Sequence, residues 1–176
     1  MKNKLLIVID MQNDFVNGSL GTKSAQDVVD NIYNKVLKEK DFYSEIIMTK
    51  DTHYSNYLQT QEGKLLPVPH CIKDTYGHDI VEKLSNIKSK IIEKHTFGYS
   101  NWEYILNKYK EDGLEEIILV GVCTDICVIS NALILKSIYP DLKITVDASC
   151  CAGTTIENHK KALDVMKCCQ INIVNE

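Results

Sequence analysis

The chain has 176 residues, a length that fits one compact domain better than two, so we expect residues 1–176 to form a single domain. Its 20 Lys and Arg and 24 Asp and Glu residues give a net charge of −4 and are mixed along the chain, which argues against a basic surface for nucleic acid. With 44% hydrophobic and 25% charged residues, the composition excludes a disordered or collagen-like chain.

Six short apolar runs predict buried strands. The first run, residues 5–9, is rich in β-branched side chains and has no polar alternation, which is typical of a strand covered on both faces of a sheet. Runs of the same kind follow at residues 46–48, 90–92, 117–120, 144–146 and 171–174.

Between these runs, apolar residues at helical spacing predict helices. The predicted helices cover residues 24–37, 100–109, 124–138 and 154–166, and their expected caps are Ser24, Ser100, Thr124 and Thr154. Alternating strands and helices predict an α/β fold of three layers, α/β/α, in which a mainly parallel, doubly wound, Rossmann-like sheet has helices on both faces. Residues 51–88 fit neither pattern, and a loop of this length is usually functional or disordered.

The sequence also bears on compartment and redox state. No apolar stretch approaches the ~20 residues that a membrane-spanning helix needs. Residues 1–4 lead directly into the first predicted strand, without the features of a cleavable leader, so the cytoplasm is the expected compartment. The seven cysteines are an odd number and include two adjacent pairs, which favours free thiols over a disulfide framework.

Polar residues that follow three of the predicted strands are candidate site residues, because ligands bind outside the carboxyl ends of the strands in open α/β sheets. Asp10 follows the first strand, Lys94 follows the third, and Cys127 lies in the first turn of the helix after the fourth. A helix dipole favours thiolate at its N-terminus, so Cys127 is the best candidate nucleophile, with Asp10 to accept its proton and Lys94 to orient the pair. Each residue also has a plain alternative role. Asp10 could cap a turn, Lys94 could be a solvated strand end, and Cys127 could be a small buried hydrophobic residue.

A second group of residues has the chemistry of metal ligands. Asp51 and His53 lie two residues apart just after the second predicted strand, and Glu62 and His70 lie in the long loop that follows. Imidazole and carboxylate groups are ligands of zinc, iron and manganese, so these residues form a candidate metal site. The alternative is an acid–base pair on a surface loop with an unrelated histidine.

Three segments, in order, resemble the signatures of the isochorismatase-like cysteine hydrolases: residues 7–15, Lys94 followed by Tyr99 and Ser100, and residues 121–128. Within that superfamily, Asp51-x-His53 together with residues 69–71 is similar to the metal-binding pattern of nicotinamidases. The resemblance implies a metal-dependent amidase of NAD salvage that hydrolyses nicotinamide to nicotinate and ammonia through a thioester. Its implied partner is a small-molecule substrate, with no nucleic acid or membrane involved, and homo-oligomer formation is left open.

The resemblance also implies the catalytic roles. Cys127 would be the nucleophile, Asp10 the general base and Lys94 the third member of the triad. The bond between Val122 and Cys123 would be a cis peptide, and the backbone N–H groups of Cys123 and Cys127 would form the oxyanion hole.

The remaining implied roles concern the substrate and the metal. Phe15 would form the aromatic wall of the ring pocket, and Tyr99 would also contact the substrate. A divalent ion, expected to be Zn²⁺ with Fe²⁺ and Mn²⁺ as alternatives, would be held by Asp51, His53, Glu62 and His70.

Three other functions compete with this interpretation. One is a metal-free hydrolase of the same fold that acts on another small amide or on an enol ether such as isochorismate. Another is a thiol redox or metal-binding protein, suggested by the cysteine count and the spacing of Cys123 and Cys127. The third is a non-catalytic binding module that has kept the fold.

Overall fold

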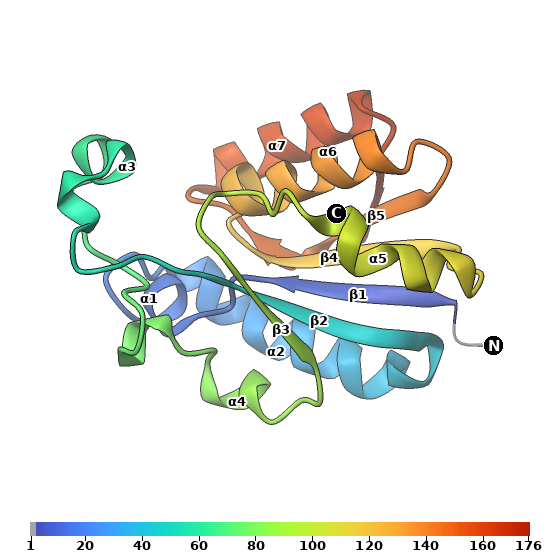
Figure 1. The fold of residues 1–176 in the computed structure, drawn as a ribbon, viewed down its shortest axis with the longest axis horizontal. Helices are drawn as coiled ribbons and strands as arrows, with labels where there is room; N and C mark the ends of the chain where they lie inside the picture. The colour runs from blue at the N-terminus through green and yellow to red at the C-terminus, as the bar shows by residue number, and fades with distance from the viewer. Residues whose placement is uncertain (1–2) are drawn as a thin grey trace.

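The strands of the protein form one parallel sheet, in a computed structural model that describes residues 3–176 (Figure 1). Its strands are β1 (Lys4–Ile9), β2 (Tyr43–Asp51), β3 (Lys90–Lys94), β4 (Glu116–Val122), β5 (Lys143–Ala152) and β6 (Asn172–Val174). The strand order is β3-β2-β1-β4-β5-β6, and every neighbouring pair is parallel. Each of the six predicted apolar runs overlaps a strand, and the predicted α/β class with its doubly wound sheet is confirmed.

Helices cover both faces of the sheet and explain why the strands lack polar alternation. The helices are α1 (Asn13–Val16), α2 (Lys23–Glu39), α3 (Gln61–Leu65), α4 (Glu82–Ser85), α5 (Trp102–Glu111), α6 (Ile129–Ile138) and α7 (Ile156–Cys168). Leu5, Ile7 and Ile9 of β1 belong to a buried cluster with α5, α6 and α7, whereas Leu6 and Val8 belong to a cluster with α1 and α2 on the opposite face (Figure 1). Both faces of β1 are therefore core, and apolar residues are required at every position.

Two of the predicted helix caps are displaced along the chain. Helix α2 is capped by Thr22, whose hydroxyl accepts from the Ala25 N–H at 3.0 Å, instead of by Ser24. Helix α7 is capped by Thr155 instead of Thr154, because the Thr154 hydroxyl and N–H both donate to the carboxylate of Asp125.

The other two predicted caps are wrong because tertiary contacts determine where the helices begin. Helix α5 begins at Trp102 without a side-chain cap, and the Trp102 Nε1–H and the Tyr99 N–H both donate to the Asn131 Oδ1. Thr124 opens a five-residue π-helix (Thr124–Val128) ahead of α6, and its hydroxyl contacts His159 instead of capping. A π-turn of this kind is common at functional sites.

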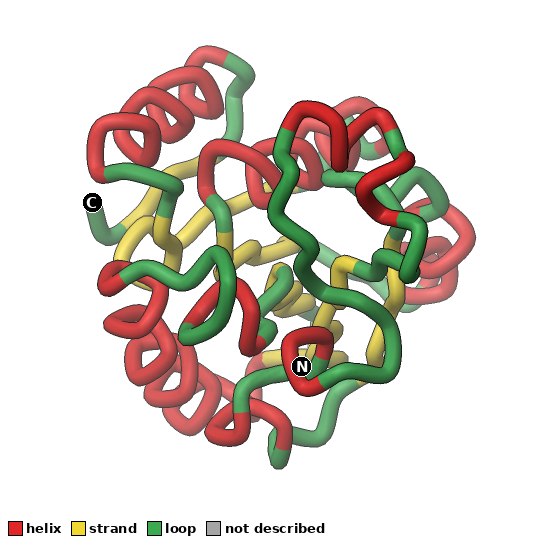
Figure 2. Tube along the Cα trace, turned by 90° about the vertical axis from the view of Figure 1, so that its left-hand side faces the viewer, coloured by secondary structure: helices red, strands yellow, loops and turns green. Residues whose placement is uncertain are grey.

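The long segment between β2 and β3 is ordered over the carboxyl ends of the strands. It contains α3, α4 and two 3-10 turns (Tyr57–Gln59 and Tyr76–His78), so it is less irregular than its sequence suggests. Figure 2 looks onto this end of the sheet, which is framed by loops and short helices. The strand order reverses between β1 and β4, and ligands of open α/β sheets bind in the crevice at such a point.

The state of the cysteines and the character of the helices can be compared with the sequence expectations. All seven cysteines are free, as predicted. Over residues 3–176, the helices are too short or too polar to cross a lipid bilayer.

Gly121 of β4 lies so close to Ile9 of β1 that no side chain fits between the two strands there. Its φ is +119°, and a Cβ there would lie 2.1 Å from the carbonyl oxygen of Ile9. We therefore expect Gly121→Ala to lower the free energy of unfolding by about 3 kcal/mol or more. Urea denaturation followed by circular dichroism measures this loss.

Gly113 provides the matched control because it also has a positive φ, +87°, but nothing lies within 4 Å of the added Cβ. Gly113→Ala should cost only the backbone strain, about 1–2 kcal/mol. Equal losses in the two variants would show that the contact with Ile9 has no energetic consequence.

Candidate active site and metal centre

The strand order brings four predicted site residues to one edge of the sheet. Lys94 ends β3, Asp51 ends β2, Asp10 follows β1, and Cys127 lies in the π-turn after β4. These four strands are consecutive in the sheet, so their carboxyl ends lie side by side. The residues predicted from separate parts of the sequence therefore meet in one place.

The Lys94 ammonium is the centre of the candidate catalytic group. Its Nζ lies 2.7 Å from Asp10 Oδ2 and 3.6 Å from Cys127 Sγ. It also lies 3.4 Å from Asp51 Oδ1 and donates to the Thr96 carbonyl oxygen at 3.1 Å. All three side chains are buried: Lys94, Asp10 and Cys127. Because charged residues are seldom buried without a partner, this argues against a solvated lysine and a turn cap.

The Asp10 carboxylate is oriented by Thr49 of β2, which sequence reasoning missed. Asp10 Oδ1 accepts from the Thr49 hydroxyl at 2.6 Å, and the Asp10 N–H donates to the Thr49 Oγ1 at 3.1 Å. Asp10 Oδ2 contacts Lys94 but has no aligned hydrogen-bond partner among the described residues. This oxygen is therefore free to accept a proton.

Burial controls the protonation states of the group. Burial raises the pKa of Asp10 even though Lys94 opposes the shift. Burial and the Asp10 carboxylate raise the pKa of the Cys127 thiol well above its usual range, with Lys94 opposing. Burial alone would lower the pKa of Lys94, but the surrounding anionic groups raise it, so the lysine stays charged. Burial thus opposes the thiolate that the helix dipole favours, so Cys127 needs a base to take its proton.

The turn that carries Cys127 is fixed by its own backbone and by α7. The Cys123 carbonyl oxygen accepts from the N–H groups of Ile126 and Val128 at 3.1 and 3.0 Å. The Val122–Cys123 peptide bond is cis, as the resemblance implies. The hydroxyl of Thr124 lies 2.8 Å from His159 Nδ1, a contact between distant segments that the sequence did not reveal.

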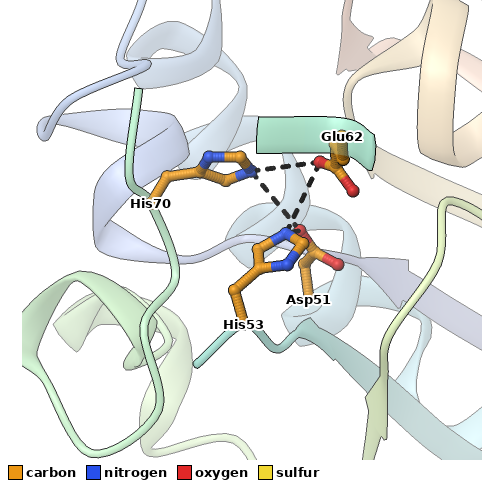
Figure 3. A group of neighbouring side chains, drawn as sticks. All are labelled: Asp51, His53, Glu62 and His70. Carbon is orange, nitrogen blue, oxygen red and sulfur yellow. Dashed lines mark hydrogen bonds and ion pairs between the residues drawn. The ribbon is translucent and has the colours of Figure 1, made fainter. Parts of the chain in front are cut away.

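The four predicted metal ligands converge around one point (Figure 3). His53 Nε2 lies 2.9 Å from Asp51 Oδ2 and 3.5 Å from Glu62 Oε1. His70 Nε2 lies 3.6 and 3.7 Å from the same two carboxylate oxygens. The four ligand atoms lie within 4.8 Å of one another, although α3, which carries Glu62, comes from the long segment between β2 and β3.

The donor set fits a divalent transition metal. His70 Nδ1 is held 2.8 Å from the Val68 carbonyl oxygen, which leaves Nε2 as the lone-pair nitrogen facing the cluster. Burial raises the pKa of Asp51, but the hydrogen bond from His53 and the charge of Lys94 outweigh it and lower that pKa, so the carboxylate is ionised. Two imidazoles with two carboxylates suit Zn²⁺, Fe²⁺ or Mn²⁺.

An aromatic residue that was not predicted supports both imidazoles. The buried ring of Tyr57 lies edge-on, with centroids 4.8 Å from His53 and 5.0 Å from His70. Its hydroxyl donates to the Leu66 carbonyl oxygen at 2.9 Å. No motif marks Tyr57 in the sequence, because its position depends on how the long loop folds back.

A cavity of about 290 Å³ connects the nucleophile with the metal cluster. Its walls are mainly apolar, and they include Cys127 together with Asp51, Glu62 and His70. Phe15 lines the cavity, where the sequence placed it.

Tyr99 does not line this cavity. Its ring contacts Trp102 at a centroid distance of 5.2 Å, and Phe97, two residues earlier, lines the cavity instead. The backbone N–H of Tyr99 is held by Asn131 on α6, which turns this part of the chain toward the core.

Comparison with known proteins identifies the family. The isochorismatase domain family matches residues 4–175. The chain therefore belongs to the isochorismatase family and is an isochorismatase-like hydrolase, as its sequence motifs indicate.

Three relatives are informative. A nicotinamidase of Saccharomyces cerevisiae is 26% identical over 98% of this chain and 100% of its own length. The pyrazinamidase/nicotinamidase of Streptococcus mutans UA159 is 30% identical and superposes with a TM-score of 0.81 over 97% of this chain and 99% of its own. The pyrazinamidase of Pyrococcus horikoshii, solved in complex with zinc, is 25% identical, with a TM-score of 0.81 over 99% of both chains.

The charge balance around Lys94 makes a prediction about stability. Lys94→Met would leave Asp10 buried without its counter-charge, and we expect it to lower the free energy of unfolding by about 3–5 kcal/mol. Because the folded-state pKa of Asp10 then rises further, the deficit should be smallest in acid, grow as the pH rises toward that pKa, and level off above it. Urea denaturation at several pH values measures the deficit.

The double variant Asp10→Asn, Lys94→Met is the control, since it removes both charges. It should be more stable than Lys94→Met alone at neutral pH. If the loss of stability in the double variant equals the sum of the losses in Asp10→Asn and Lys94→Met, then Lys94 does not compensate the Asp10 charge.

Proposed function

We propose that this hydrolase is a nicotinamidase, which converts nicotinamide to nicotinate and ammonia and so serves NAD salvage. The observation that carries the proposal is the single cavity onto which both Cys127 and the metal cluster open. A hydrolase of an arbitrary small amide needs Cys127, Asp10 and Lys94 but no metal ligands. A group of four candidate metal ligands, of which Asp51, Glu62 and His70 line the same cavity, is what recognition of a pyridine ring nitrogen beside the amide would require.

The cavity provides separate contacts for the two ends of the substrate. A divalent ion, when bound by Asp51, His53, Glu62 and His70, supplies a Lewis-acidic position for the pyridine nitrogen. Phe15 and Phe97 line the apolar wall against which the ring can pack. A ring held in this way places its amide carbon near Cys127, and this positioning supplies much of the rate enhancement.

The first chemical step forms a thioester. Asp10 Oδ2 takes the proton of the Cys127 thiol, and the sulfur attacks the amide carbon. The N–H groups of Cys123 and Cys127 donate to the oxyanion, while the Lys94 ammonium keeps the charge of the site balanced. When the C–N bond breaks, the protonated Asp10 returns its proton to the nitrogen, and ammonia leaves.

The second step regenerates the thiol. Asp10, again ionised, accepts a proton from a water molecule whose oxygen attacks the thioester carbon. The C–S bond breaks, nicotinate is released, and the proton held by Asp10 returns to the Cys127 sulfur. The raised pKa of Asp10 suits this role, because a base that also acts as an acid works best when its pKa is near the working pH.

Ammonia release from nicotinamide and from benzamide tests the proposal. Benzamide has the same shape but lacks the ring nitrogen, so we expect metal-loaded enzyme to hydrolyse nicotinamide with a kcat/KM at least about a hundredfold higher. Chelation of the metal, or His53→Ala, should remove most of this difference because the two amides then make the same contacts.

Cys127→Ala is the control for covalent catalysis, and it should abolish hydrolysis of both amides with little effect on stability. Equal rates for the two amides in loaded enzyme would contradict the proposed recognition of the pyridine nitrogen. Full nicotinamide hydrolysis by metal-free enzyme would instead support the metal-free hydrolase.

A further inference from the structure

The turn that follows β1, which continues into the short helix α1, contacts both chain segments that supply candidate metal ligands. It belongs to the first sequence signature, residues 7–15, whose Asp10 and Phe15 lie at the candidate active site. Gln12 and Asp14 lie between them and are directed away from the reacting atoms. Their hydrogen bonds are made to backbone groups next to or within the ligand residues.

The Gln12 side chain holds the backbone of Asp51 on both sides of its Cα atom. Its Nε2–H₂ group donates to the Asp51 carbonyl oxygen at 2.8 Å and to the His78 carbonyl oxygen at 2.9 Å. Its Oε1 accepts from the Asp51 N–H at 2.7 Å. Gln12 is completely buried, so water does not compete for these bonds. They therefore fix the direction in which the Asp51 carboxylate leaves the main chain.

The Asp14 side chain holds the backbone of the segment that carries His70. Its Oδ2 accepts from the Cys71 N–H at 2.8 Å, and this N–H belongs to the peptide group that joins His70 to Cys71. Gly77 covers the carboxylate so closely that a Cβ there would lie 2.0 Å from Asp14 Oδ2. The carboxylate is thus held between two segments, and its bond to Cys71 sets the backbone from which the His70 imidazole projects.

We propose that Gln12 and Asp14 are positioning residues that preset Asp51 and His70 for the metal and thereby increase metal affinity. The inference rests on the metal site of the proposed function. Neither side chain is among the four ligands, so each acts only through the backbone it holds. Groups that orient ligands in this way commonly change metal affinity by about ten- to a hundredfold.

The same turn offers a matched control. Asn13 lies between the two positioning residues and is also buried, but its Nδ2 donates to the Tyr76 carbonyl oxygen at 2.8 Å and contacts no ligand residue. Asn13→Ala therefore removes a hydrogen bond from the turn without touching the backbone of Asp51 or His70.

Zn²⁺ affinity of the full chain, measured by competition with a chromogenic chelator, tests the proposal. Gln12→Met and Asp14→Ala should each weaken Zn²⁺ binding by about ten- to a hundredfold. Asp14→Asn keeps an acceptor oxygen for the Cys71 N–H and should restore most of the affinity. Asn13→Ala should bind Zn²⁺ as the unaltered protein does. Circular dichroism of the metal-free variants shows that each is folded.

Two results would overturn the proposal. One is unchanged Zn²⁺ affinity in both Gln12→Met and Asp14→Ala, and the other is an equal loss in Asn13→Ala, which would indicate general damage to the turn. If the unaltered protein binds no Zn²⁺, Fe²⁺ or Mn²⁺, the inference fails together with the metal site. If the unaltered protein binds Zn²⁺ and both variants bind it equally well, only the inference fails and the proposed function stands, so the two failures are distinguishable.

Discussion

The charge of one buried lysine holds the site together. Two buried carboxylates, Asp10 and Asp51, stand at the ends of adjacent strands, and Lys94 Nζ lies 2.7 and 3.4 Å from their oxygens. Without a cation between them, burial and mutual repulsion would force at least one carboxylate to take up a proton. Because Lys94 lies between them, Asp10 and Asp51 can both be ionised although both are buried.

Asp51 connects the two halves of the site because its two oxygens have different partners. Oδ1 faces Lys94, whereas Oδ2 faces both histidines of the metal cluster. A cation bound by the cluster would attract the Asp51 carboxylate and so weaken its interaction with Lys94. The Lys94 ammonium would then interact more strongly with Asp10 and Cys127. In the proposed mechanism, substrate recognition and activation of Cys127 thus share one carboxylate, that of Asp51.

The sequence predicts those features that follow from local chemistry and strand order. Continuous apolar runs identify the strands because both faces of the sheet are covered, and polar residues at strand ends identify Asp10, Lys94 and Asp51. Features that depend on contacts between distant segments are missed. Thr49 orients Asp10 from the neighbouring strand, and Phe97 replaces Tyr99 in the cavity wall because α6 holds the Tyr99 backbone. The protonation of the nucleophile is likewise a property of its burial, which spacing does not reveal.

The central claim is that Cys127 forms a thioester with the acyl group of nicotinamide beside the metal cluster. The most direct measurement is mass spectrometry of metal-loaded enzyme quenched in acid during turnover of nicotinamide, followed by peptide mapping. The account predicts a mass increase of one nicotinoyl group on the peptide that contains Cys127 and on no other cysteine. Turnover of nicotinamide with no adduct on Cys127, or with the adduct on another cysteine, would contradict it.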